Sequence, residues 1–177
     1  MKSLRASIQF YRMEHLSGVL LTLLVVGVFL TGCQGTMLST SAKGQTIQPA
    51  AQIKLVKTGP QSGQFSDGYV TVNYKYTASG GNLQMSGVVQ FGSAISGNFL
   101  VVQTFDLGLL LGDATGKVLL QQGVTTAMEV NVSSSQNFNT TVVLPPQAAT
   151  MAFTYNGSAY GAGGESPTSF WADPVER

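Results

Sequence analysis

The sequence predicts an all-β domain, an antiparallel β-sandwich of about seven to eight strands, which follows a separate N-terminal leader in a chain of 177 residues. Two observations support this fold class. Short segments of alternating apolar and polar residues follow one another, and turns rich in Gly, Pro, Asn and Ser separate them roughly every ten to fifteen residues. The same region has no amphipathic helical pattern of convincing length. This combination is typical of a sandwich or a barrel.

The leader has the features of a secretory signal peptide. Three positive side chains precede an apolar run of 12 residues, Val19 to Leu30. That length suits a signal-peptide core and is short for a membrane-spanning helix, which needs about 20 residues. The run ends in Leu30-Thr31-Gly32-Cys33, where two small residues precede the only cysteine of the chain. We expect residues 1–32 to be a cleaved helical signal peptide; an uncleaved anchor ending near Gly32 is the alternative.

These four residues resemble the lipobox of bacterial lipoproteins. The resemblance implies cleavage between Gly32 and Cys33, a diacylglyceryl group on the Cys33 thiol, and acylation of the new amino terminus, for example with palmitate. Two or three acyl chains anchor a protein stably to a membrane, whereas one is marginal. In this family Gln34, directly after the cysteine, favours the outer membrane if the source is Gram-negative. The long leader departs from the pattern, and Met13 is an alternative start.

Composition limits the partners and the chemistry of the mature protein. Charged residues make up 10% of the chain and form no basic stripe, which argues against a nucleic-acid partner. His15 is the only histidine and lies in the leader, and Cys33 is expected to be lipidated. The mature domain therefore lacks the residues for a Ser-His-Asp triad, a cysteine nucleophile or a Cys/His zinc site. We expect no cofactor, no metal and no enzymatic activity.

The chain after the leader divides into a tether and one domain. Residues 33–51 are small, polar and without periodicity, so we interpret them as the lipidated cysteine and a flexible tether. Residues 52–177 are then a single domain, which is long enough to bury a core.

Strands are predicted through the first half of this domain. We expect a strand over 52–58 and a turn over 59–63, where Gly and Pro cluster. Strict alternation predicts a strand over 69–78 with one buried and one wet face. The residues 79–82, Ser-Gly-Gly-Asn, are typical of a hairpin connection, and the alternation resumes over 83–91.

The second half begins after a turn at 96–98 with a long apolar strand, 99–111. Apolar residues occupy both of its faces, so it is buried on both sides for part of its length or carries an exposed patch. Gly-, Ser- and Pro-rich turns separate the further expected strands, 117–122, 128–132, 138–144 and 151–155. A glycine-rich piece, 157–164, leads to the C-terminal segment.

The arrangement resembles an immunoglobulin-like or fibronectin-III-like sandwich. The resemblance concerns the architecture alone, because the Cys…Trp…Cys spacing of antibody domains is absent from the sequence. Without a disulfide, an exported domain of this kind must be stabilised by packing.

Acidic residues supply few candidate sites. Asp106 lies in an otherwise apolar strand and is either a buried carboxylate with a raised pKa, able to act as an acid or base, or a residue of the wet face, which its alternation with Phe105 and Leu107 favours. Asp67-Gly68 and Gly112-Asp113 look like fragments of calcium loops. Both lack the repeated acidic spacing of such loops, so turn chemistry is the better interpretation.

Aromatic residues near the C-terminus are the candidate ligand-binding residues: Tyr155, Tyr160, Phe170 and Trp171. Exposed aromatic rings stack on sugars or fill pockets of a partner. The other interpretation, which we favour, is that Phe170 and Trp171 pin the C-terminal tail to the sandwich.

The sequence therefore predicts a lipid-anchored protein of the cell envelope whose non-catalytic sandwich binds an envelope protein or a polysaccharide. The apolar double face of 99–111 favours a protein partner. A carboxylate-based glycan hydrolase and a carbohydrate-binding module are the alternatives. The module would require Tyr155, Tyr160 and Trp171 to be exposed and coplanar, and the hydrolase would require two carboxylates across a cleft.

Overall fold

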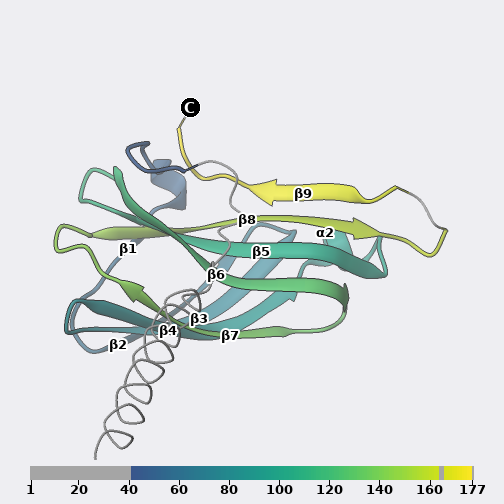
Figure 1. Cartoon of the computed structure of the whole chain (residues 1–177), viewed down its shortest axis with the longest axis horizontal. Helices are drawn as coiled ribbons and strands as arrows, with labels where there is room; N and C mark the ends of the chain where they lie inside the picture. The colour runs from purple at the N-terminus through teal and green to yellow at the C-terminus, as the bar shows by residue number, and fades with distance from the viewer. Residues whose placement is uncertain (1–40, 164–165, 177) are drawn as a thin grey trace, which may run out of the picture. The chain divides into compact units, whose positions relative to one another are not determined.

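The computed structural model describes residues 41–163 and 166–176, which form nine strands in two antiparallel sheets (Figure 1). The predicted all-β antiparallel sandwich is therefore confirmed, with slightly more strands than expected. The signal peptide with Gly32, the lipidation site Cys33 and the tether up to residue 40 lie outside the described residues. Within the described ranges, no helix is long and apolar enough to cross a membrane.

One sheet has four strands in the order β2-β3-β4-β7. Their bounds are Pro60–Ser66 for β2, Val70–Ser79 for β3, Asn82–Phe91 for β4 and Gln136–Val143 for β7. β3 and β4 form the predicted hairpin. Its two loop residues, Gly80 and Gly81, have φ of 56° and 76°, the positive values that a two-residue hairpin turn requires.

The turn expected over 59–63 is wrong, because Pro60 begins strand β2. Proline is tolerated there since β2 is an edge strand of the sheet. Gly63 serves packing instead of a turn: a Cβ at this position would lie 2.4 Å from the hydroxyl oxygen of Tyr74. The strand expected over 52–58 is correspondingly short, and only Ile53–Lys54 pair as β1.

The other sheet has the order β1-β8-β5-β6, and β9 also pairs with β8. The bounds are Val101–Gly112 for β5, Val118–Asn131 for β6, Thr150–Tyr160 for β8 and Thr168–Ala172 for β9. β1 and β9 pair with different parts of β8, near its start and its end respectively. A short helix, α2 (Ser93–Ser96), precedes the turn expected at 96–98.

β6 is one strand of 14 residues, although the sequence predicts two strands, 117–122 and 128–132. Its register against β5 shifts at Val124 and again at Leu119, which are extra residues on β6. Each extra residue moves the following side chains to the other face of the sheet. The apolar residues therefore do not keep one alternating phase, and the pattern looks interrupted.

The main core fills the space between the two sheets, which lie one above the other in Figure 1. Both sheets contribute large side chains that are almost completely buried, among them Leu83, Met85, Phe105, Leu107, Met151, Phe153 and Tyr155. Burial of each such side chain stabilises the fold by roughly 1.5–3 kcal/mol. Packing of this extent supplies the stability of a domain that has no disulfide.

A second apolar cluster covers one part of the outer face of the five-stranded sheet. It consists of Ala42, Ile47, Leu110, Val118, Ala152 and Val175. The Ile47 N–H donates to the carbonyl oxygen of Gly116 at 2.8 Å, and Ile47 also forms a β-bridge with Val175. The flexible-tether prediction is therefore wrong for residues 41–51. This segment is mostly polar in sequence, but its one isoleucine, Ile47, is fully buried against the sheet.

The same cluster explains the apolar double face of β5. Phe105 and Leu109 face the main core, whereas Leu110 lies in the second cluster and is fully buried. β5 is thus buried on both faces for part of its length. The alternative, an exposed apolar patch around Leu110, is wrong, and it no longer supports a protein partner.

Candidate binding face

Part of the outer face of the five-stranded sheet is not covered by the second cluster. Two rows of directly paired residues cross β9, β8, β5 and β6 there, and directly paired residues share one face of a sheet. We call this surface the open face. Its first row consists of Trp171, Asn156, Asp106 and Thr126, and its second row consists of Ser169, Ser158, Thr104 and Met128. β9 lies at its edge in Figure 1.

Trp171 and Phe170 are neighbours on β9 and point in opposite directions. Phe170 is only 4% exposed and packs against Phe105 and Tyr155, with ring centroids 6.3 and 6.1 Å away. Trp171 is 66% exposed and lies on the open face. The tail-pin interpretation is therefore right for Phe170 and wrong for Trp171, since a strand sends successive side chains to opposite faces.

Tyr155 is a core residue and not part of an exposed aromatic platform. It is 2% exposed, and its hydroxyl donates a hydrogen bond to Oδ2 of Asp67 in the β2–β3 connection. The other oxygen of Asp67 accepts the backbone N–H groups of Tyr69 and Val70, both at 3.0 Å. Burial, and secondarily the hydrogen bond to Asp67, raises the pKa of Tyr155. This hydrogen bond joins the two sheets.

Tyr160 is the last residue of β8 and faces the same side as the open face. Alternation along β8 places Tyr160 on the same face as Asn156 and Ser158, since Ala159, between Ser158 and Tyr160, is fully buried on the other face. Its hydroxyl donates to Oε2 of Glu129 on β6 at 2.8 Å, and this hydrogen bond raises the pKa of Tyr160. Because β5 lies between β8 and β6, the ring must reach across β5.

Asp106 lies in the middle of the open face, between Asn156 on β8 and Thr126 on β6. It is on the solvent side of β5, as its alternation predicts, but it is half-buried, and burial raises the pKa of its carboxyl group. Among the residues that the structure describes, none donates a hydrogen bond to this carboxylate. A charged acceptor without a donor is costly in proportion to its burial.

No protein-family model, curated protein or solved structure matches this chain. Function is therefore inferred from the two outer surfaces of the sandwich.

The acidic turns have structural partners, which confirms the turn interpretation. Asp67 accepts the backbone and tyrosine donors already described. Oδ1 of Asp113 accepts the backbone N–H groups of Thr115 and Lys117, at 2.8 and 3.0 Å, and the Thr115 hydroxyl. The hydrogen bond from the Thr115 side chain is the main reason that the pKa of Asp113 is lowered. In residues 41–163 and 166–176, His, Cys, Asp and Glu form no group of three that could hold a metal.

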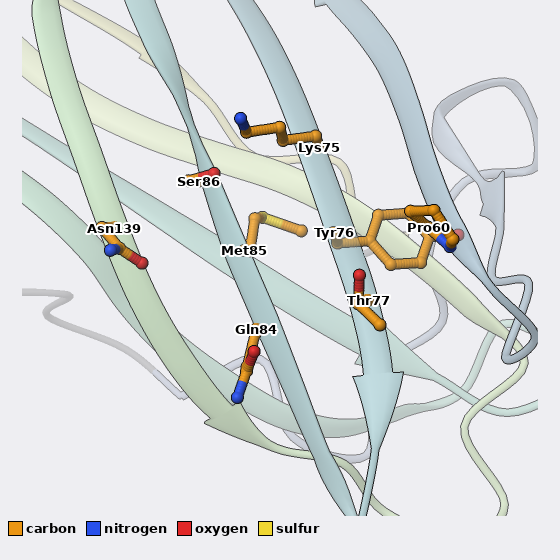
Figure 2. A pocket seen from close by; sticks show the side chains of 8 residues that line it. All are labelled: Pro60, Lys75, Tyr76, Thr77, Gln84, Met85, Ser86 and Asn139. Atoms are coloured by element: carbon orange, nitrogen blue, oxygen red, sulfur yellow. The ribbon is translucent and has the colours of Figure 1, made fainter.

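The outer face of the four-stranded sheet is a second polar surface, which sequence reasoning did not single out. It contains a hollow of about 210 Å³ whose lining residues come from all four strands. Figure 2 shows these side chains. We call this surface the amide face because amide and hydroxyl side chains dominate it, and the hollow is lined by Pro60, Lys75, Tyr76, Thr77, Gln84, Met85, Ser86 and Asn139. The hollow has no exposed aromatic ring, since Tyr76 is buried in the core.

The structure thus divides the four aromatic candidates into two pairs. Tyr160 and Trp171 face the outside of the same sheet, whereas Tyr155 and Phe170 are buried in the core. Asn156 and Ser158 were not predicted from the sequence, although their alternation with buried neighbours on β8 is a usable signal.

Proposed function

We propose that this chain is a lipid-anchored protein of the bacterial cell envelope whose single β-sandwich binds an envelope polysaccharide or protein without catalysis. The lipobox-like sequence at Cys33 supports the anchor and its location, in the outer membrane if the source is Gram-negative. The observation that carries the binding role is the open face, a polar surface with an exposed tryptophan and an unengaged carboxylate.

A binding role agrees better with the surroundings of the acidic side chains than hydrolysis does. A glycan hydrolase of the common type needs two carboxyl groups that flank the scissile bond. Asp67 and Asp113 accept hydrogen bonds that shape turns, and Glu129 accepts the Tyr160 hydroxyl. These three carboxylates have structural partners, whereas Asp106, in the middle of the open face, accepts no hydrogen bond from the residues that the structure describes.

The anchor is tested by metabolic labelling of the full-length protein with an alkyne-bearing palmitate analogue in a bacterial host. We expect label on the wild type and none on Cys33→Ser, and we expect the wild type in the membrane fraction. Equal labelling of both proteins, or a soluble unmodified wild type, would contradict the proposal.

The binding role is tested by crosslinking in intact cells of the native host, followed by mass spectrometry of what is attached. We expect a defined envelope protein or polysaccharide on the wild type. A free, uncrosslinked chain would count against this role even if the label on Cys33 is found.

A further inference from the structure

We propose that the open face binds an uncharged, hydroxyl-rich glycan chain that crosses β8 obliquely, from Trp171 on β9 to the Tyr160 ring over β5, with both rings stacking on sugars and with Asn156 and Asp106 hydrogen-bonding hydroxyl groups of the chain. This inference rests on the proposed binding role and specifies its ligand and its surface.

The spacing of the two aromatic rings fits an extended ligand. Trp171 pairs with Asn156, and Tyr160 follows Asn156 by four residues on the same strand and on the same face. At about 3.4 Å per residue the two backbone positions are roughly 14 Å apart in the direction of β8. The rings are further separated because Trp171 lies on β9 at one side of β8, whereas the Tyr160 ring reaches over β5 at the other side. An extended glycan can contact both rings at once, whereas a single small solute cannot.

Polar groups lie beside the two rings on the open face. Asn156 offers both a donor and an acceptor, and Asp106 offers two acceptor oxygens in register beside it. The Ser158 hydroxyl lies 2.9 Å from the Thr104 hydroxyl and 3.2 Å from Oε1 of Gln103. Sugar hydroxyls donate and accept in the same way, so they match this mixture of groups.

The charge of this surface also favours a neutral ligand. The open face carries the carboxylate of Asp106, the Glu129 carboxylate lies beside it in a hydrogen bond with Tyr160, and none of its eight residues is basic. An anionic polymer would be repelled by Asp106, while a hydroxyl group can donate to it. The desolvation that raises the pKa of Asp106 is a cost to the free protein. A hydroxyl donor from a bound ligand would supply the missing partner.

Tyr160 is also held in a fixed orientation. Its hydroxyl bond to Glu129 restrains the ring across β5 at 2.8 Å. A ring that is already restrained loses little conformational entropy when a ligand stacks on it. The outward direction of Trp171, in contrast, follows from side-chain alternation along β9, because its neighbour Phe170 is buried in the core.

The single tryptophan of the chain makes this proposal directly measurable, because Trp171 is the only source of indole fluorescence. Full-length protein in detergent is titrated with uncharged probes: cello-, malto-, xylo- and manno-oligosaccharides and an N-acetylglucosamine oligomer. We expect at least one of them to shift the emission of Trp171 and to protect it from acrylamide quenching. Polygalacturonate and a glucosamine oligomer serve as the anionic and cationic probes.

Variants then locate the ligand. Asp106→Ala and Asn156→Ala keep the fluorophore, and each should weaken binding about tenfold or more, as expected for the loss of a well-placed hydrogen bond. Trp171→Ala, followed by calorimetry, should abolish measurable binding. Lys75→Ala on the amide face is the matched control and should leave the affinity unchanged.

Three results would overturn the inference: no response to any uncharged probe, a response to the charged probes alone, or equal losses in Asp106→Ala and Lys75→Ala. Circular dichroism of each variant separates a local loss of binding from unfolding. If the uncharged probes fail while crosslinking in cells still captures an envelope protein, the glycan inference fails and the broader binding role stands.

Discussion

The hydrogen bond between Tyr155 and Asp67 should contribute measurably to stability, because it connects the two sheets of the sandwich. Tyr155 belongs to β8 in the five-stranded sheet, and Asp67 lies between β2 and β3 of the other. In Tyr155→Phe the ring and its packing remain, and only the hydroxyl is lost. The variant therefore isolates one partly buried hydrogen bond between the two sheets.

The magnitude follows from the charge and exposure of the acceptor. Hydrogen bonds to charged groups contribute about 1.5–3 kcal/mol net. Asp67 is exposed, so water replaces the lost donor and no buried group is left unpaired. We therefore expect the lower end, about 1.5 kcal/mol. For a domain of this size that corresponds to a decrease in Tm of roughly 5–7 °C.

The matched control is Tyr160→Phe, which removes the same hydroxyl from a hydrogen bond to Glu129 at the exposed surface. Exposed pairs of this kind contribute about 0–1 kcal/mol. Urea unfolding followed by circular dichroism should separate the two variants. Equal losses of unfolding free energy in both would refute the reasoning. In an Asp67→Ala background, Tyr155→Phe should have little further effect, because the acceptor is already gone.

Three further predictions concern packing and charge. Ile47→Ala should lower the unfolding free energy by about 2–5 kcal/mol in denaturant titrations, since Ile47 is fully buried; a change near zero would mean that 41–51 is a tether after all. Gly87→Ala should lower the unfolding free energy by about 1–3 kcal/mol, because its Cβ would lie 2.2 Å from the Asn73 carbonyl oxygen. Gly123→Ala is the control and should be close to neutral, because no atom lies within 4 Å of its Cβ. Thermal melts that rank the two variants in the other order would contradict this. The raised pKa of Asp106 means that the folded state binds the proton more tightly than the unfolded state, so the charged carboxylate lowers stability in full above the raised folded-state pKa, and this penalty is lost as the pH falls through that value to the unfolded-state pKa. Asp106→Asn should therefore raise the Tm at pH 7, with a gain in unfolding free energy of no more than about 1 kcal/mol for a half-exposed group. The Tm at pH 3 should not change; a larger increase in Tm at pH 3 than at pH 7 would contradict this prediction.

The prediction for Asp106 connects stability with binding. A carboxylate that destabilises the free protein and is needed by a ligand is expected at a binding surface, where function and stability often conflict. Asp106→Asn should be more stable at neutral pH than the wild type. Asp106→Ala should bind glycan more weakly. The two variants together distinguish a functional charge from an incidental one.

Several elements of the fold could be predicted from residue order alone. Strict alternation in 69–78 and the Gly-Gly pair after it predict the β3–β4 hairpin, because side-chain alternation and turn conformation are local properties of the chain. The solvent-facing position of Asp106 follows from the same local rule. The presence of one histidine, His15, and one cysteine, Cys33, both before the described residues, is likewise a matter of counting, and it limits the chemistry of residues 41–163 and 166–176 without any structure.

Other features depend on contacts between distant segments. Whether Leu110 forms an exposed patch depends on residues 41–51 and on Val175, which lie far away in sequence and pack on it. The bulges in β6 arise from pairing with β5, so the phase of its alternation cannot be read from β6 itself.

The aromatic residues show the same division most clearly. The order of residues shows that Phe170 and Trp171 must point in opposite directions on a strand, but not which of them meets the core. The pairing of β9 with β8 decides this, since it brings Phe170 over the main core and leaves Trp171 in the row with Asn156 and Asp106. Alternation is a local property of the backbone, whereas the assignment of a face to core or solvent requires the neighbouring strands to be in place.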